Sequence, residues 1–181
     1  MKRTFLISLP NTPNVGPMLD AAKVVLATAR NLGCDIQKVR FAMETGVIEI
    51  VQQFARALGD VPIEGQGNLT NGTLLCELQP ILNHPVVRES AKTKNYWAAI
   101  GLEGDLSARY DASSVCYDEV VLNSIEEARD GNATVVIASR EAIEMGLAYY
   151  FDDFPVLGLP QVTLVSMESI DHNATLELLV A

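Results

Sequence analysis

Two glutamates follow a predicted buried strand in the segment Val135–Phe151, "VVIASREAIEMGLAYYF". The apolar run ends at Ser139, a residue type that caps helices, so we expect a helix to begin there. Ligands of open parallel sheets bind beyond the carboxyl ends of the strands, which is where this segment lies. Glu141 falls in the first helical turn, where the helix dipole alone accounts for a carboxylate. Glu144 lies one turn further on.

Glu144 has two interpretations. Gly146 follows it and presents no side chain, so a substrate could approach the carboxylate of Glu144 closely. In the alternative interpretation, Glu144 is solvated and Gly146 allows a close helix crossing. The pattern of this segment alone does not choose between a working carboxylate and a surface residue.

Two other segments carry polar side chains that could bind a substrate. Asn11 lies in the loop predicted after the first strand, and Ser139 and Asn11 are candidate donors toward an ionised carboxylate. The loop "DLSARYDASS" holds Arg109 among two aspartates and a tyrosine, a set suited to binding a sugar or a phosphate. The alternative for Arg109 is an ion pair within a solvated loop.

Other kinds of chemistry find little support. The chain has two histidines, His84 and His172, both in predicted turns, so a histidine metal site or a serine triad is not expected. Its three cysteines form no CxxC pair and are interpreted as buried thiols in a reducing cytoplasm. The stretch "GQGNLTNG" has neither a predicted strand before it nor a GK[ST] sequence after it, so phosphate binding there is not predicted. We therefore expect no cofactor and no metal.

The composition narrows the choice of partner. A net charge of −10 over 181 residues argues against nucleic acid and against an anionic membrane surface. No apolar window approaches the ~18 residues of a membrane span, and a cytoplasmic location is expected. A small-molecule substrate remains compatible with the composition.

The apolar pattern predicts a single α/β domain. Strands are expected at "TFLISLP", "ATVVIAS", "QVTLVSM" and "ATLELLVA", and helices from Met18 to Leu32 and within residues 124–131 and 140–153. We also predict one long helix, capped by Asp35 and carrying an apolar stripe from Ile36 to Leu58, followed by a loop over residues 59–72. The expected architecture is a three-layer domain with a mostly parallel central sheet, flavodoxin/Rossmann-like, with a helical middle insertion or lid at about residues 40–95.

Three segments resemble the nucleoside 2-deoxyribosyltransferase-like family. They are "FLISLPN" with the helix ending "NLGCDI", then "SIEEARDGNATVVIAS", and then "EAIEMGLAYYF" leading into "PVLGLPQVTLV". The resemblance implies cleavage or transfer of the N-glycosidic bond of a nucleoside or nucleotide, with Glu144 attacking the anomeric carbon. Ser139 and Asn11 would then support the carboxylate, and Asp118 is a candidate acid for the leaving base. The segment "ASREA" lacks the aspartate and the glycine-threonine pair that the family usually has there.

Two rival functions remain open. One is a non-catalytic homo-oligomeric binding or assembly protein, in which the stripe from Ile36 to Leu58 makes the subunit contact. The other is an NAD-cleaving domain related to Toll/interleukin-receptor-type domains. For the two enzymatic functions the expected partner is a small molecule. A homo-oligomer is expected for all three.

Overall fold

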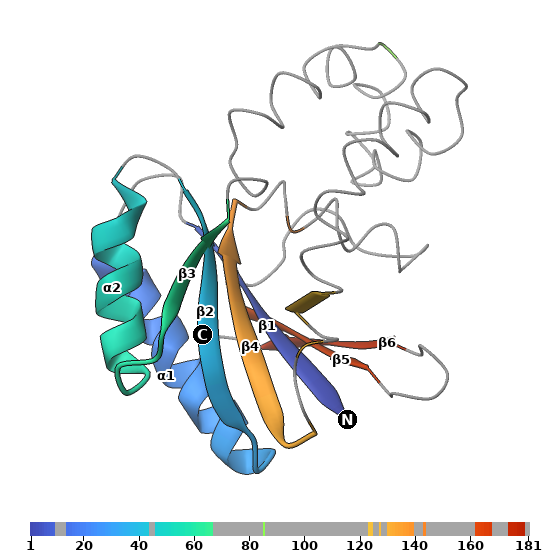
Figure 1. Cartoon of the computed structure of the whole chain (residues 1–181). Coiled ribbons are helices and arrows are strands. Elements are labelled where there is room, and N and C mark those ends of the chain that lie inside the picture. The colour runs from blue at the N-terminus through green and yellow to red at the C-terminus, as the bar shows by residue number, and fades with distance from the viewer. Residues whose placement is uncertain are drawn as a thin grey trace.

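The computed structural model describes residues 1–9, 14–43, 46–66, 130–139, 162–167 and 174–179, with the single residues 85, 123, 124, 127 and 143. Within these ranges six strands form one sheet, and two helices pack against it (Figure 1). In chain order the elements are β1 (Lys2–Ser8), α1 (Val15–Asn31), β2 (Asp35–Ala42), α2 (Val47–Ala57), β3 (Ile63–Gln66), β4 (Asn132–Ala138), β5 (Val162–Met167) and β6 (Ala174–Leu179).

The sheet is mixed, with four parallel strands and an antiparallel pair. The strand order is β3-β2-β4-β1-β5-β6, in which β3, β2, β4 and β1 are parallel. β5 runs antiparallel to β1, and β6 runs antiparallel to β5. The predicted mostly parallel α/β sheet is therefore confirmed.

The helices α1 and α2 cover the same face of the sheet (Figure 1). α1 approaches through small buried residues such as Ala21 and Ala22, while α2 inserts Ile50 and Phe54. These side chains form one apolar cluster with alternate residues of the strands, among them Phe5 of β1. Burying each large apolar side chain contributes about 1.5–3 kcal/mol, so this cluster is the main stabilising layer of the described structure.

The opposite face of the sheet, which we call the second face, is buried and carries polar as well as apolar residues. The residues of β1 and β4 that alternate with the apolar cluster point to it, and the registers Thr4↔Thr134 and Leu6↔Thr163 align these positions across strands. Five of the buried polar residues lie there: Thr4, Ser8, Arg40, Thr134 and Thr163. The helical residues Ser124 and Glu127 contact Arg40 from above this face. The chain therefore places helical residues on both faces of the sheet, as a three-layer domain requires.

The predicted single helix from Asp35 to Leu58 is wrong. The segment forms β2, then a turn, then α2. A register shift in the β2–β4 pairing between Ile36 and Lys38 disturbs the alternation of β2. Ile36 and Val39 therefore fall three residues apart although they belong to a strand, and this spacing imitates that of a helix.

The start of α2 explains the second half of this error. Gly46 has a φ of 82°, a left-handed conformation that residues with a side chain rarely adopt, and it is the N-cap of α2. The predicted long helix would have placed Gly46 in its interior, whereas in the structure Gly46 ends the turn that separates β2 from α2. The predicted loop at residues 59–72 is also corrected, because it contains β3.

Other predicted elements are confirmed where the structure describes them. β1, β4, β5 and β6 lie at the predicted strands, and α1 begins three residues before the predicted start at Met18. Residues 40–43 and 46–66 supply the end of β2, α2 and β3 to the main domain, while the rest of the predicted insertion lies outside the described residues apart from Pro85. No helix in the described ranges combines the length and the hydropathy that crossing a membrane requires.

Candidate functional site

The candidate site lies at the carboxyl ends of β1 and β4, which are adjacent and parallel. From β1 the chain passes β4 to reach β2, whereas from β4 it passes β1 in the opposite direction to reach β5. The connections that leave β1 and β4 therefore diverge, and ligands of open α/β sheets bind at such a switch point. The backbone N–H of Leu9 donates to the carbonyl of Ala138 at 2.8 Å, which holds the two strand ends together. Ser8 and Ser139, at these ends, are both buried.

A helix begins after each of these two strands. α1 begins a few residues after the end of β1. Its N-cap, Asn14, accepts a hydrogen bond from the N–H of Gly16 at 3.0 Å. The first turn of α1 contains no acidic residue. After β4, the carbonyl of Ser139 accepts the N–H of Ile143 at 3.2 Å, as at the start of a helix, and Ile143 is helical. The positive end of the α1 dipole thus favours an anion at this edge.

The side chains supplied by the two loops suit binding better than covalent chemistry. Residues 9–14 read "LPNTPN" and residues 139–142 read "SREA", so neither segment contains a histidine, a cysteine or an aspartate. Hydroxyl, amide and backbone N–H groups donate hydrogen bonds to an anion. Arg140 follows Ser139 in the sequence and supplies a cationic side chain to the same segment.

Of the predicted site residues, the structure places one. Ser139 is buried, with 4% exposure, directly after β4, as expected. Glu144, Asn11, Asp118 and Arg109 lie outside the described residues, so their roles stay predictions. Among the described residues, no three histidine, cysteine, aspartate or glutamate side chains lie together as metal ligands would.

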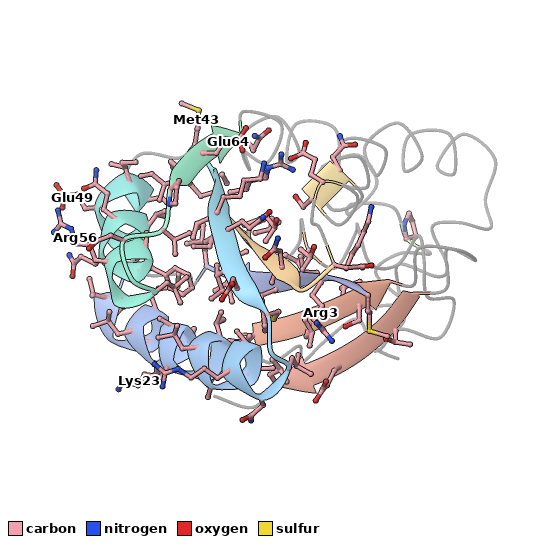
Figure 2. All side chains as sticks on the ribbon, turned by 60° about the horizontal axis from the view of Figure 1, so that its bottom comes forward. Arg3, Lys23, Met43, Glu49, Arg56 and Glu64 are labelled. Atoms are coloured by element: carbon pink, nitrogen blue, oxygen red, sulfur yellow. The ribbon has the colours of Figure 1, made fainter. Side chains whose placement is uncertain are left out.

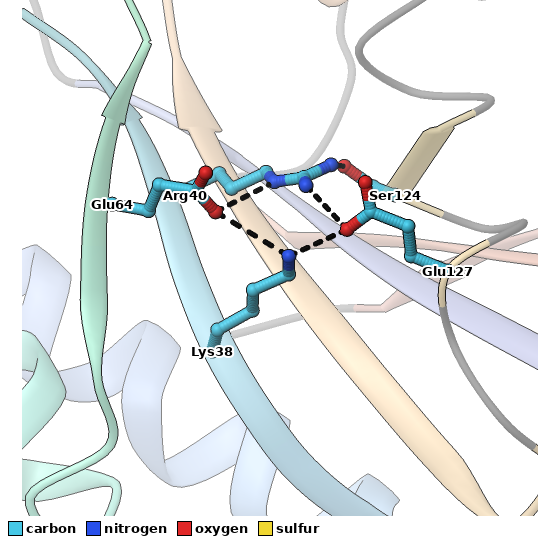
Figure 3. Close-up of polar contacts among 5 residues, drawn as sticks. All are labelled: Lys38, Arg40, Glu64, Ser124 and Glu127. Carbon is cyan, nitrogen blue, oxygen red and sulfur yellow. Dashed lines mark hydrogen bonds and ion pairs between the residues drawn. The ribbon is translucent and has the colours of Figure 1, made fainter.

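A cluster of charged residues on the second face was not anticipated from the sequence (Figure 3). Arg40 donates to Glu64 at 3.2 Å, to Ser124 at 2.8 Å and to Glu127. Lys38 lies 3.3 Å from Glu64 and 2.6 Å from Glu127, so both cations share both carboxylates. We call these five residues the Arg40 cluster.

The ion pairs of the Arg40 cluster suit a structural role. Hydrogen bonds from Arg40 and Lys38 hold the pKa of Glu127 below its usual value. Partial burial by itself raises the pKa of Glu64, but hydrogen bonding and attraction to Arg40 and Lys38 outweigh it and the net pKa is lowered. Two cations and two anions thus neutralise one another, and both carboxylates stay ionised. A general base or acid needs a pKa nearer the working pH, so this cluster holds Glu127 onto the sheet rather than doing acid–base chemistry.

A shallow hollow lies elsewhere, along α2 and the amino end of β3. It has a volume of about 200 Å³ and is lined by Gln52, Ala55, Arg56, Asp60, Val61 and Ile63. Because Ile63 is the first residue of β3, the hollow is at the end of the sheet opposite to the candidate site. It therefore contributes nothing to that site.

Comparison with solved structures finds the same fold over the whole chain. A phosphoglycerate mutase from Plasmodium falciparum matches with a TM-score of 0.60 at 13% identity, covering 98% of each chain. A phosphoglycerate mutase from Bacillus anthracis matches with a TM-score of 0.60 at 13% identity, over 98% of this chain and 92% of that one. A mycobacterial glucosyl-3-phosphoglycerate phosphatase matches with a TM-score of 0.56 at 12% identity over 98% of each chain. No protein-family model matches the sequence, and no curated protein matches it.

These likenesses overturn the resemblance inferred from the sequence. The structural neighbours are proteins of the phosphoglycerate mutase and phosphatase type, not nucleoside 2-deoxyribosyltransferases or glycosidases. The three segments behind that resemblance are strand–loop–helix units with short apolar runs, which many parallel α/β folds share. They identified the fold class correctly and the family wrongly.

Proposed function

We propose that this chain binds a phosphorylated small molecule at the carboxyl edge of β1 and β4 and hydrolyses its phosphate ester. The observation that carries the proposal is that two helix starts, at Asn14 and Ser139, follow two adjacent parallel strands at a switch point of the sheet. A phosphate dianion accepts several hydrogen bonds at once, and N–H groups at helix starts supply them without any counter-charge of their own. The proteins that share this fold carry names that denote action on phosphorylated small molecules, namely phosphoglycerate mutase and glucosyl-3-phosphoglycerate phosphatase.

The electrostatics require the phosphate to be recognised locally. With a net charge of −10, the chain as a whole repels an anion. The carboxyl edge differs because the first turn of α1 carries no acid, and in the segment after β4 the charge of Arg140 balances that of Glu141. Interactions between charges fall off within about 10 Å at ordinary salt, so these nearby groups outweigh distant surface carboxylates.

A second candidate function is binding without turnover. It is favoured by the composition of the two loops, because residues 9–14 and 139–142 contain no histidine, cysteine or aspartate. These are the side chains, besides serine, threonine and glutamate, that most readily form a covalent bond to a transferred group. Hydrolysis would then need a nucleophile from Ser8, Thr12, Ser139 or Glu141, or a directly attacking water. Phosphate release separates the two functions.

The test combines binding and turnover on a panel of phosphate monoesters that includes phosphoglycerates and sugar phosphates. Calorimetry measures binding of each ester, and a colorimetric assay measures release of inorganic phosphate. Ser139→Ala is expected to weaken binding, whereas Ser166→Ala, which alters another buried serine on β5, should leave it unchanged. Binding with phosphate release supports the hydrolase, and binding without release supports the second candidate. Failure of every ester and of inorganic phosphate to bind would refute both.

A further inference from the structure

Most of the large apolar side chains that are exposed in the described residues lie at one edge of the sheet. Four such side chains are exposed, and three of them, Met43, Ile48 and Ile63, belong to the end of β2, to α2 and to β3. β3 is the last strand of the sheet on this side, and three of its four residues are exposed. An exposed edge strand is a ready template for pairing with another strand unless charge or a covering element protects it.

Among the described residues, β3 pairs with β2 alone, so its outer edge has no strand partner there. Its only charged residue, Glu64, turns to the second face and is paired with Lys38 and Arg40. The carbonyl of Pro62 accepts the N–H of Val39 in β2, so alternation directs the peptide groups of Ile63 and Gly65 away from β2. The outer edge therefore presents backbone donors and acceptors beside apolar side chains, which suits another β-strand.

The two ends of this edge are complementary in shape. At the carboxyl end of β3, Met43 lies across Gly65; a Cβ built on Gly65 would come within 2.8 Å of the Met43 Cγ. Met43 and Ile48 are 60% and 41% exposed, so two apolar side chains project into solvent on either side of the turn between β2 and α2. At the amino end of β3 lies the hollow of about 200 Å³, with Ile63 and Ala55 in its lining. One end thus projects and the other end is hollowed.

The two ends are also complementary in charge. Glu49 and Arg56 lie seven residues apart on α2, which is two helical turns, and both project from the same side of the helix (Figure 2). Gln52 and Arg56 line the hollow beside Ile63, so this side of α2 borders the edge of β3. If an identical helix lay antiparallel to α2, each Glu49 would meet the Arg56 of the other helix.

We propose that a second copy of this chain docks on this edge through a twofold axis near Glu64. The two β3 strands pair antiparallel, which sets Ile63 of one copy opposite Gly65 of the other and continues the sheet across both subunits. The projection of Met43 and Ile48 enters the hollow of the other copy, and two Glu49–Arg56 pairs form. A twofold interface requires such a self-complementary surface. The two Glu64 carboxylates near the axis are each neutralised by Lys38 and Arg40 of their own copy.

Sedimentation and light scattering of the full chain over a micromolar dilution series test the proposal. We expect a dimer, and each of Glu49→Arg and Arg56→Glu should weaken it about tenfold or more because two pairs per dimer become repulsive. The double variant E49R/R56E should restore wild-type dimerisation, since the pairs reform with reversed polarity. Lys23→Glu makes an equally large charge change at an exposed position of α1 and serves as the control. It should leave the dimerisation constant unchanged.

A second variant probes the apolar contact independently of charge. Ile48→Lys introduces an ammonium group into the proposed contact at a position that is 41% exposed in the single chain, so the fold itself should tolerate it. We expect a monomer whose circular dichroism matches that of the wild type. A monomeric wild-type protein, a double charge variant that fails to recover, or an Ile48→Lys dimer as tight as the wild type would each overturn the proposal.

Discussion

Arg40 and Glu127 lie 87 residues apart in the sequence, yet their side chains are hydrogen bonded above the second face of the sheet. Arg40 is 5% exposed, and its guanidinium also donates to Glu64 and Ser124. One buried side chain thus joins β2 to β3 and to the helical residues that precede β4. The Arg40 cluster is the main polar link that the described structure shows between the sheet and its second helical layer.

Replacing Arg40 should destabilise the fold. Arg40→Met keeps most of the aliphatic stem but leaves Ser124 and two carboxylates without the guanidinium. Breaking a fully buried pair costs about 3–5 kcal/mol, and because Glu64 and Glu127 are about half exposed we expect about 2 kcal/mol. Urea unfolding followed by circular dichroism measures the loss.

The matched control for Arg40→Met is an exposed ion pair. Lys23 lies 2.7 Å from Asp20, with side chains 77% and 62% exposed. Lys23→Met should change the free energy of unfolding by less than about 0.5 kcal/mol. Equal effects of the two substitutions would show that the Arg40 cluster contributes no more than an ordinary surface pair.

The Arg40 cluster also predicts a dependence of stability on pH. The hydrogen bonds that Arg40 and Lys38 donate to Glu127 lower its folded-state pKa from the ordinary 4.5. A carboxyl with a depressed folded-state pKa stabilises the fold above its unfolded-state pKa, and this contribution is lost as the pH falls through the folded-state pKa. The folded-state pKa of Glu64 is also lowered, so its contribution to stability is likewise lost as the pH falls.

Urea midpoints measured between about pH 7 and pH 3 test this dependence. The wild-type midpoint should fall more steeply below about pH 5 than that of Glu127→Gln, which cannot lose this proton-linked contribution. Near neutral pH the variant should be the less stable of the two. Parallel curves for the two proteins would contradict the role assigned to the Glu127 ion pairs.

The sequence predicted the strands of the sheet better than the Arg40 cluster. Strands depend on local residue patterns, whereas the cluster depends on contacts between distant segments. β1 and β4 are continuous apolar runs bounded by polar residues, a local pattern that is sufficient to predict a buried parallel strand. The position of Ser139 after β4 followed from the same pattern. In contrast, Arg40 acquires its role only from partners 24 and 87 residues away, and no local pattern reports such distances.

The error at residues 35–58 also hid the Arg40 cluster. A helix at Asp35–Leu58 gives Arg40 no neighbouring strands, whereas β2 directs it to the second face between β3 and β4. The start of α1 was recoverable from the sequence, because Asn14 precedes the helical run and Pro17 lies in its first turn. The family was not recoverable, because short apolar strand–helix segments are common to many α/β folds.

Two threonines on the second face should respond to substitution in an unusual direction. Thr4 and Thr134 are register partners on β1 and β4, both are fully buried, and neither hydroxyl has a hydrogen-bond partner in the described structure. An unpaired buried hydroxyl is destabilising, so Thr134→Val, which replaces it with a methyl group, should stabilise the fold by about 1 kcal/mol.

Thr175 provides the contrast for Thr134, because its hydroxyl donates to the carbonyl of Ser166 at 3.4 Å. Thr175→Val removes a satisfied group and should leave stability unchanged or slightly lower. Both values come from urea unfolding under one set of conditions. A loss of stability in Thr134→Val would mean that the hydroxyl is satisfied in solution, and a buried water is then the simplest partner.

The N-cap of α1 links stability to the proposed phosphate site. Asn14→Ala removes the acceptor of the Gly16 N–H and should lower the free energy of unfolding by about 1 kcal/mol. Asn14→Asp retains a capping oxygen, so its stability should stay near that of the wild type. Its carboxylate would nevertheless bring a negative charge to the helix end that the phosphate is proposed to approach.

The two variants therefore separate folding from function. Asn14→Asp should weaken phosphate binding in calorimetry although it unfolds at nearly the wild-type urea concentration, and the deficit should shrink as salt screens the added charge. Asn14→Ala should show the reverse order, with a clear loss of stability and a smaller loss of binding. If Asn14→Asp binds phosphate esters as tightly as the wild type, the start of α1 lies too far from the ligand to be part of its site.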